Sequence, residues 1–144
     1  MAVKPRLRRN RYPTRRLKDK WDDNEQCHLC GTKLILPPVE GKRNICQTCY
    51  LKRSASSALG SSSHWPLLLA KLNKQGWRCA YTGIPLVLRE NASIDHILPV
   101  SRYPKFRHNI NNVEWVDWRV NHMKLSMTKT EFIAFAKKVS KRTD

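Results

Sequence analysis

The sequence predicts an α+β protein in which a small zinc module precedes a compact domain of short strands and helices. Three observations support this prediction. The chain has 144 residues, a length that suits one compact domain with a small module or tail. Four of its five cysteines form two closely spaced pairs. The second half of the chain alternates strand-like and helix-like patterns, and an apolar share of 40% argues against a wholly disordered chain.

The charge of the chain points to a polyanionic partner. Lys and Arg number 28 against 11 Asp and Glu, which gives a formal net charge of +17. A protein this basic is expected to act on a polyanion, with nucleic acid as the leading candidate. No apolar run is long enough to span a bilayer, and no apolar signal segment follows the start. We therefore expect no membrane partner and a cytoplasmic location.

Residues 1–20 are expected to form a flexible basic arm. They carry nine Lys or Arg and one Asp, with little apolar content to bury. Such an arm gains affinity for DNA by releasing counterions from phosphates. A solvated terminus and a transit peptide are the alternatives. The arginines expected to contact DNA are Arg6, Arg8, Arg9, Arg11, Arg15 and Arg16.

Residues 21–53 are predicted to form a zinc ribbon. The pairs Cys27-x-x-Cys30 and Cys46-x-x-Cys49 are separated by fifteen residues that include a hairpin-like stretch at 34–42. Each two-residue gap lets the chain turn two thiolates toward one point, as tetrahedral Zn²⁺ requires. Four thiolates fill the coordination shell, so the zinc is expected to be structural. Two disulfide bonds are the alternative to zinc. The role expected for the ribbon is to brace the next domain, to bind DNA or to hold a protein partner.

A flexible linker is predicted over residues 54–63, because this stretch is rich in serine. The second domain then covers residues 64–144. Its first helix is expected to be capped by Ser63, to carry an apolar stripe and to stop at Gly76. That stripe consists of Trp65, Leu68, Leu69 and Leu72.

The remaining elements alternate strands and helices. A hairpin is predicted over residues 77–89, a strand over 93–98, a basic loop over 101–111 and a strand over 113–116. Asp117 is expected to cap a helix that ends near residue 127. A capping box, Thr128-x-x-Glu131, precedes a last helix. Its apolar stripe is Phe132, Phe135, Ala136 and Val139. The aromatic residues expected in the core are Trp65, Trp77, Trp115, Trp118, Phe132 and Phe135.

The second domain also contains four short motifs in a fixed order. They are Cys79-x-Tyr81-Thr82-Gly83, Asp95-His96-Ile97-Leu98-Pro99, Asn112-Val113 and Asn121-x-x-Lys124. Over roughly residues 64–136 these motifs resemble the HNH endonucleases, also called ββα-metal or His-Me finger nucleases, in a His-Asn-Asn version. Flanking segments resemble phage-encoded members, which would place the protein in the cytoplasm of a bacterial host. Many such domains have a four-cysteine zinc site around the motif. Here only Cys79 remains, so we expect it to be buried without metal.

The resemblance implies a metal-dependent endonuclease that acts on double-stranded DNA, and the chemistry of the residues agrees. His96 is expected to act as the general base. Asn112 is expected to fix His96 and the loop behind it. Asp95 and Asn121 offer oxygen ligands to Mg²⁺ or Mn²⁺. A regular strand would send Asp95 and His96 to opposite faces, so the strand must end or twist there.

Further residues of this domain are expected to contact DNA: Arg102, Lys105, Arg107 and Lys124. His122 is a rival metal ligand, but its side chain would point about 100° away from that of Asn121 on a helix. The alternative function is a non-catalytic zinc-ribbon DNA-binding or regulatory protein that retains the nuclease fold. Site preference, nicking against double-strand cutting, the preferred metal, the oligomeric state and a homing, packaging or host-directed role stay open.

Overall fold

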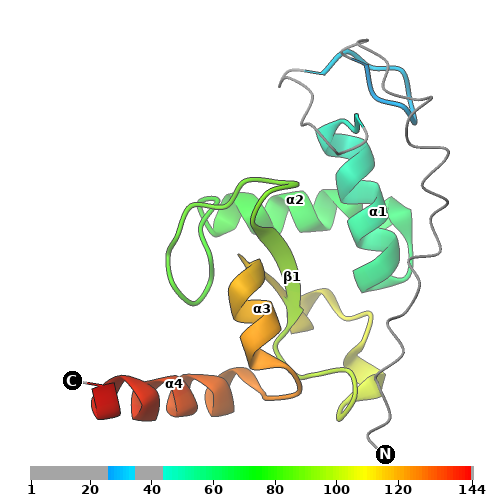
Figure 1. Cartoon of the computed structure of the whole chain (residues 1–144). Coiled ribbons are helices and arrows are strands. Elements are labelled where there is room, and N and C mark those ends of the chain that lie inside the picture. Colours follow the sequence, from blue (N-terminus) through cyan, green and yellow to red (C-terminus); the bar gives the residue numbers. More distant parts are fainter. Residues whose placement is uncertain (1–25, 35–43, 144) are drawn as a thin grey trace, which may run out of the picture. The chain divides into compact units, whose positions relative to one another are not determined.

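The computed structural model describes residues 26–34 and 44–143, and the chain divides into two compact units at residues 1–46 and 47–144. The described elements are helices and one two-stranded sheet, which confirms the predicted α+β class (Figure 1). The predicted basic arm with its six arginines, and the hairpin-like stretch of the zinc ribbon, lie outside the described residues apart from Leu34. Within the described part, no helix combines the length and the apolar character needed to cross a membrane.

The second unit begins with helix α1, Gln47–Leu59. The predicted flexible linker over 54–63 is therefore wrong for its first six residues. The boundary between the two units lies between residues 46 and 47 instead of within that linker. Leu51, Ala55 and Leu59 recur every four residues and are buried, so they form one apolar stripe. The serines between these residues resemble a linker in composition, so the sequence did not predict this helix. Gly60 follows the helix with φ +78°, a conformation that glycine adopts without steric cost.

Helix α2, Trp65–Lys74, packs against α1. A short 3₁₀ turn, Ser62–His64, precedes it and is capped by Ser61, whose hydroxyl accepts a hydrogen bond from the Ser63 N–H. The N-cap position of α2 itself is His64, which makes no side-chain cap bond, so the predicted Ser63 cap is wrong. The predicted stripe is confirmed, with Leu68 and Leu72 buried and the other two members partly buried. The chain turns after the helix at Gly76, as predicted.

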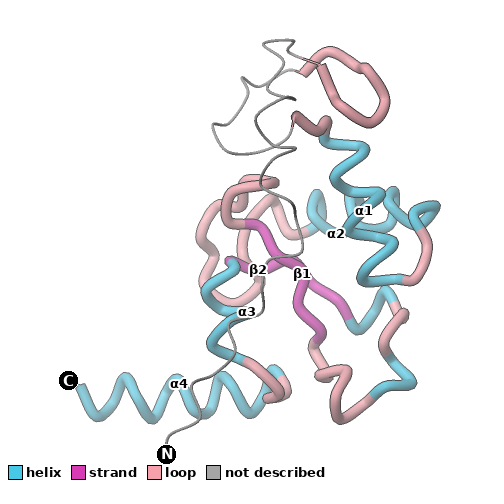
Figure 2. Tube along the Cα trace, turned by 45° about the vertical axis from the view of Figure 1, so that its right-hand side comes forward, coloured by secondary structure: helices cyan, strands magenta, loops and turns pink. Residues whose placement is uncertain are grey.

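The sheet joins β1, Ala92–His96, to β2, Val113–Asp117, in antiparallel register (Figure 2). The predicted hairpin over 77–89 is reduced to a single bridge between Arg78 and Pro85. Trp115 anchors β2 to α2, because its indole Nε1–H donates to the Leu68 carbonyl at 2.9 Å. The Gln75 side chain bonds both the N–H and the C=O of Trp115, at 3.0 and 2.8 Å, and so replaces a third strand there.

Two helices follow the sheet. α3, Trp118–Lys124, is capped by Asp117 as predicted, although it ends three residues earlier than expected. α4, Lys129–Thr143, begins with the predicted capping box: the Glu131 N–H donates to Thr128 Oγ1 at 3.2 Å, and the Thr128 N–H donates to Glu131 Oε2 at 3.1 Å.

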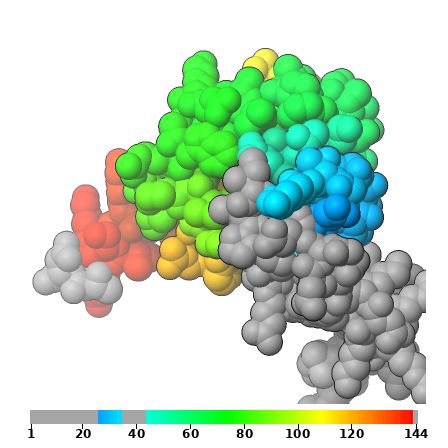
Figure 3. Space-filling model, turned by 90° about the horizontal axis from the view of Figure 1, so that it is seen from above, coloured from blue at the N-terminus to red at the C-terminus, as the bar shows by residue number. Residues whose placement is uncertain are grey.

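The outer part of α4 is solvent-exposed (Figure 3). Phe132 packs its ring edge-to-face on Tyr81 at 5.7 Å. Phe135 is 56% exposed and Val139 48% exposed, so the predicted apolar stripe does not pack over its length. Trp118 is 48% exposed as well. The prediction that all six aromatic residues lie in the core is therefore wrong for Phe135 and Trp118.

Candidate functional site

The four paired cysteines form one cluster. Their Sγ atoms all lie within 4.8 Å of one another, a spacing at which they can hold a single metal ion. Gly31 makes the turn of the first pair with φ +73°, and its N–H donates to the Cys27 carbonyl at 2.8 Å. No disulfide joins any of the chain's five cysteines, all of which lie in the described ranges. Thiolates at this spacing suit a tetrahedral ion such as zinc.

Backbone hydrogen bonds prepare Cys27 to bind a metal as a thiolate. Burial alone raises the pKa of its thiol, because it disfavours the charged form. The backbone N–H groups of Cys46, Cys30 and Leu29 donate hydrogen bonds to the sulfur, and the net pKa is lowered. Since the thiolate is the form that binds metal, these bonds favour the ligand state.

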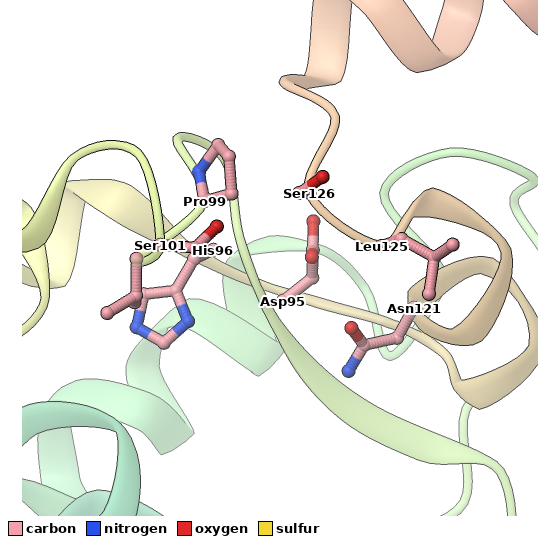
Figure 4. A pocket seen from close by; sticks show the side chains of 8 residues that line it. Asp95, His96, Pro99, Ser101, Asn121, Leu125 and Ser126 are labelled. Atoms are coloured by element: carbon pink, nitrogen blue, oxygen red, sulfur yellow. The ribbon is translucent and has the colours of Figure 1, made fainter.

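A second constellation lies where β1 ends. Asp95 and His96 are the last two residues of β1, and Asn121 faces them from α3. All three line a pocket of about 370 Å³ whose other walls come from residues 99–101 and 125–126. Figure 4 shows His96 and Asn121 on either side of Asp95. Because the strand stops at His96, the two neighbouring side chains reach one pocket despite the alternation of a regular strand.

The His96 ring is oriented by a backbone carbonyl that the sequence did not identify. Its Nε2 lies 3.0 Å from the carbonyl oxygen of Arg107. A carbonyl only accepts, so Nε2 carries the proton and Nδ1 is left with the lone pair in the neutral ring. Backbone groups carry no residue signature, which is why the sequence pointed to the side chain of Arg107 instead.

Asn112 braces the loop that follows β1. Its Oδ1 accepts from the Leu98 N–H at 2.8 Å, while its Nδ2 donates to the carbonyls of Leu98 at 3.0 Å and Phe106 at 3.3 Å. The side chain is buried and closes the loop from both ends. Its amide makes no hydrogen bond to the His96 ring within the described chain. Asn112 therefore fixes the loop as expected but acts on His96 only indirectly, since the braced loop leads into Arg107.

Asn121 presents its amide oxygen to the pocket. Its Nδ2 donates to Ser93 Oγ at 2.8 Å and to the Ile94 carbonyl at 3.0 Å. Because that carbonyl can only accept, the nitrogen must face the strand. Oδ1 makes no hydrogen bond to the described residues. This leaves an oxygen ligand beside the Asp95 carboxylate.

Asp95 is held in a buried ion pair. Lys124 Nζ lies 3.2 Å from Asp95 Oδ1 and also donates to the His96 carbonyl at 2.6 Å. Burial raises the pKa of Asp95, and the Lys124 cation partly offsets this rise. Lys124 is only 1% exposed, so the prediction that it contacts DNA is wrong for this conformation. Its place on the helix, three residues after Asn121, turns it inward instead.

A polar layer supports Asp95 from behind. The Tyr81 hydroxyl donates to Asp95 Oδ2 at 3.3 Å, and Glu114 lies directly opposite Asp95 in the sheet register. Lys129 pairs with Glu114 at 2.9 Å and lies 4.8 Å from the centre of the Tyr81 ring. Burial and the two nearby carboxylates raise the pKa of Tyr81, so its hydroxyl stays a donor. The sequence predicted no role at the site for these residues.

The other predicted residues lie outside the pocket. Arg102 forms an ion pair with Glu131 at 2.7 Å, and Lys105 lies over the Phe106 ring. His122 is exposed and packs on the Trp118 ring rather than at the pocket, which agrees with the preference for Asn121. Cys79 is 4% exposed, so its predicted burial is confirmed.

The pocket therefore combines a carboxylate, an amide oxygen and an oriented imidazole. Carboxylate and amide oxygens are ligands that Mg²⁺ and Mn²⁺ prefer, and an imidazole with an accessible lone pair can take a proton. The chain matches no protein-family model and no curated protein sequence. A functional proposal consequently rests on these residues and their geometry.

Proposed function

We propose that the protein is a metal-dependent DNA endonuclease of the HNH type, which hydrolyses phosphodiester bonds. The observation that carries this proposal is the convergence of Asp95, His96 and Asn121 on one pocket, with the His96 ring turned by the Arg107 carbonyl. Hydrolysis of a phosphodiester needs an activated water, stabilisation of the phosphate charge and help for the leaving oxygen. Each of these needs has a candidate group in the pocket.

His96 is the general base in this proposal. With its proton held on Nε2 by the Arg107 carbonyl, the ring offers Nδ1 to a water molecule. Asn112 supports this arrangement from a distance, because it closes the loop between Leu98 and Phe106. A positioned base of this kind typically contributes about 10²–10⁴-fold to a rate.

Asp95 and Asn121 would hold the divalent cation. Their oxygens are hard ligands on two rigid elements, β1 and α3, and two ligands leave room for water and a phosphate oxygen. When bound, the ion would neutralise phosphate charge and stabilise the leaving oxygen. Tyr81 donates a hydrogen bond to Asp95 Oδ2 and Lys124 donates one to Asp95 Oδ1, so both oxygens of the carboxylate are held in place.

Charge supports DNA as the substrate. Residues 51–144 carry sixteen Lys or Arg against six Asp or Glu, in addition to the basic stretch at 1–20. Phosphate contacts supply most of the sequence-independent affinity for DNA. In the same proposal the four-cysteine cluster binds a structural zinc ion, and the ribbon braces the enzyme or holds DNA or a protein partner.

A second candidate is a non-catalytic DNA-binding or regulatory protein with the same fold. The Asp95–Lys124 ion pair favours it, because the ammonium already neutralises the carboxylate without any metal ion. The two candidates differ in whether DNA is cut when a divalent ion is supplied.

Cleavage of supercoiled plasmid tests the proposed function. The wild-type protein is incubated with Mg²⁺, with Mn²⁺ and with EDTA, beside His96→Ala and the matched control His122→Ala, whose exposed ring lies outside the pocket. We expect cutting by the wild type and His122→Ala with a divalent ion only, and cutting slower by about 10²–10⁴-fold by His96→Ala. Equal cutting by all three proteins would reject the proposal, and DNA binding without any cutting would favour the second candidate.

A further inference from the structure

Leu125 has a backbone conformation that suits glycine. It directly follows α3, with φ 49° and ψ −122°. A Cβ atom is poorly accommodated there, so a leucine in this position costs stability. Strained residues of this kind persist where the surroundings hold them in place, and they cluster at functional sites.

Burial does not compensate for the strain at Leu125. The side chain is 78% exposed, more than any other large apolar side chain in the described ranges. Trp77 provides a contrast, since it also has positive φ, at 57°, but its ring packs against the core and donates to Asn73 Oδ1 at 2.9 Å. Packing within the described residues therefore supplies little contact to compensate the strain at Leu125.

The position of Leu125 indicates which molecule supplies that contact. Leu125 lines the same pocket as Asp95, His96 and Asn121, and Figure 4 shows its side chain next to Asn121. The preceding residue, Lys124, turns inward to Asp95, so the tight bend places the leucine at the rim. A molecule that fills the pocket covers the leucine.

We propose that Leu125 is an apolar contact to the nucleoside next to the phosphate bound in the pocket. This inference rests on the proposed nuclease function. An apolar side chain gains nothing from a charged phosphate, whereas the sugar ring and the base edge offer apolar surface to bury. With His96 on one side of Asp95 and Leu125 beside Asn121 on the other, the leucine fixes which phosphate stands opposite His96.

The test separates the strain from the contact. Leu125→Gly relieves the backbone and removes the side chain, and Leu125→Ala removes most of the side chain but keeps the strain. Arg89→Gly is the matched control, because Arg89 has φ 73° and lies outside the pocket lining. Binding to a duplex oligonucleotide is measured in the His96→Ala background, where the proposed function predicts cleavage slowed by about 10²–10⁴-fold.

We expect both Leu125 variants to bind duplex DNA about tenfold more weakly than the His96→Ala parent, which corresponds to about 1.4 kcal/mol. The slope of affinity against salt concentration stays unchanged, because no ionic contact is lost. Leu125→Gly melts at a higher temperature than the parent, and Arg89→Gly binds DNA like the parent.

Binding of Leu125→Gly equal to that of the parent would overturn the inference, as would a loss that Arg89→Gly shares. A changed salt slope would also overturn it, because it would reveal lost phosphate contacts instead. Failure of the nuclease proposal is recognised separately: the protein then binds no duplex DNA, or His96→Ala cuts plasmid as well as the wild type does.

Discussion

Replacing Lys124 with methionine removes the cation beneath the pocket and keeps a side chain of similar length. Lys124 and Asp95 have side chains that are 1% and 5% exposed, with Nζ 3.2 Å from Oδ1. Removing one member of a buried ion pair leaves an uncompensated charge and costs about 3–5 kcal/mol. The hydrogen bond from Nζ to the His96 carbonyl is lost as well. For a unit of this size we expect the melting temperature to fall by about 12 °C or more.

Thermal unfolding followed by circular dichroism at neutral pH, in EDTA and in Mg²⁺, measures this effect. Arg102→Gln is the control, because the Arg102–Glu131 pair has side chains that are 44% and 45% exposed. Exposed pairs contribute only about 0–1 kcal/mol, so the control should melt close to the wild type. Mg²⁺ should stabilise Lys124→Met more than the wild type, since a metal ion at Asp95 replaces the missing cation.

A double variant checks the physical reason for the loss. Asp95→Asn combined with Lys124→Met removes both charges, so it should recover a large part of the stability that Lys124→Met alone loses. If Lys124→Met melts within a few degrees of the wild type, like Arg102→Gln, the buried pair does not hold the pocket together. If Mg²⁺ shifts both proteins equally, Asp95 is not the residue that receives the cation.

Two further predictions concern other parts of the chain. Purified protein should contain one zinc ion per chain by elemental analysis. Cys30→Ser should lower the zinc content and Cys79→Ser should not, because Cys79 lies outside the cluster. Equal zinc content in both variants would refute the assignment. Arg119 and its N–H lower the pKa of Asp117 to about 2 despite burial. An unfolded Asp has a pKa of about 3.9, so this stabilisation is complete above that value and is lost as the pH falls through about 2. Asp117→Ala should therefore lower the unfolding free energy by about 1–2 kcal/mol at neutral pH. Denaturant titrations should show that the difference in unfolding free energy between the variant and the wild type becomes smaller below about pH 4. A difference that does not change with pH would contradict this explanation.

Local chemistry made several elements predictable. The Asp117 cap, the capping box at Thr128 and Glu131, and the stop at Gly76 each depend on residues within one turn of the helix end. The cysteine cluster was predictable for a similar reason, since the two pairs restrict the thiols to a small volume. These features need no knowledge of the rest of the fold.

Features that depend on tertiary context could not be predicted from the sequence. Helix α1 has a regular apolar period, but its serines resemble a linker in composition. Lys124 resembles a surface lysine until the fold places Asp95 beside it. The Arg107 carbonyl belongs to the backbone and has no sequence pattern. Tyr81 and Glu114, for which the sequence predicted no role at Asp95, approach it only after β1 pairs with β2 and the preceding turn closes.

The central claim is that His96 is the base of a metal-dependent nuclease, and the rate of single-turnover cleavage tests it most directly. With saturating Mg²⁺ and DNA, His96→Ala should be slower than the wild type by about 10²–10⁴-fold, while His122→Ala should follow the wild type. A His96→Ala rate that matches the wild-type rate would contradict the account.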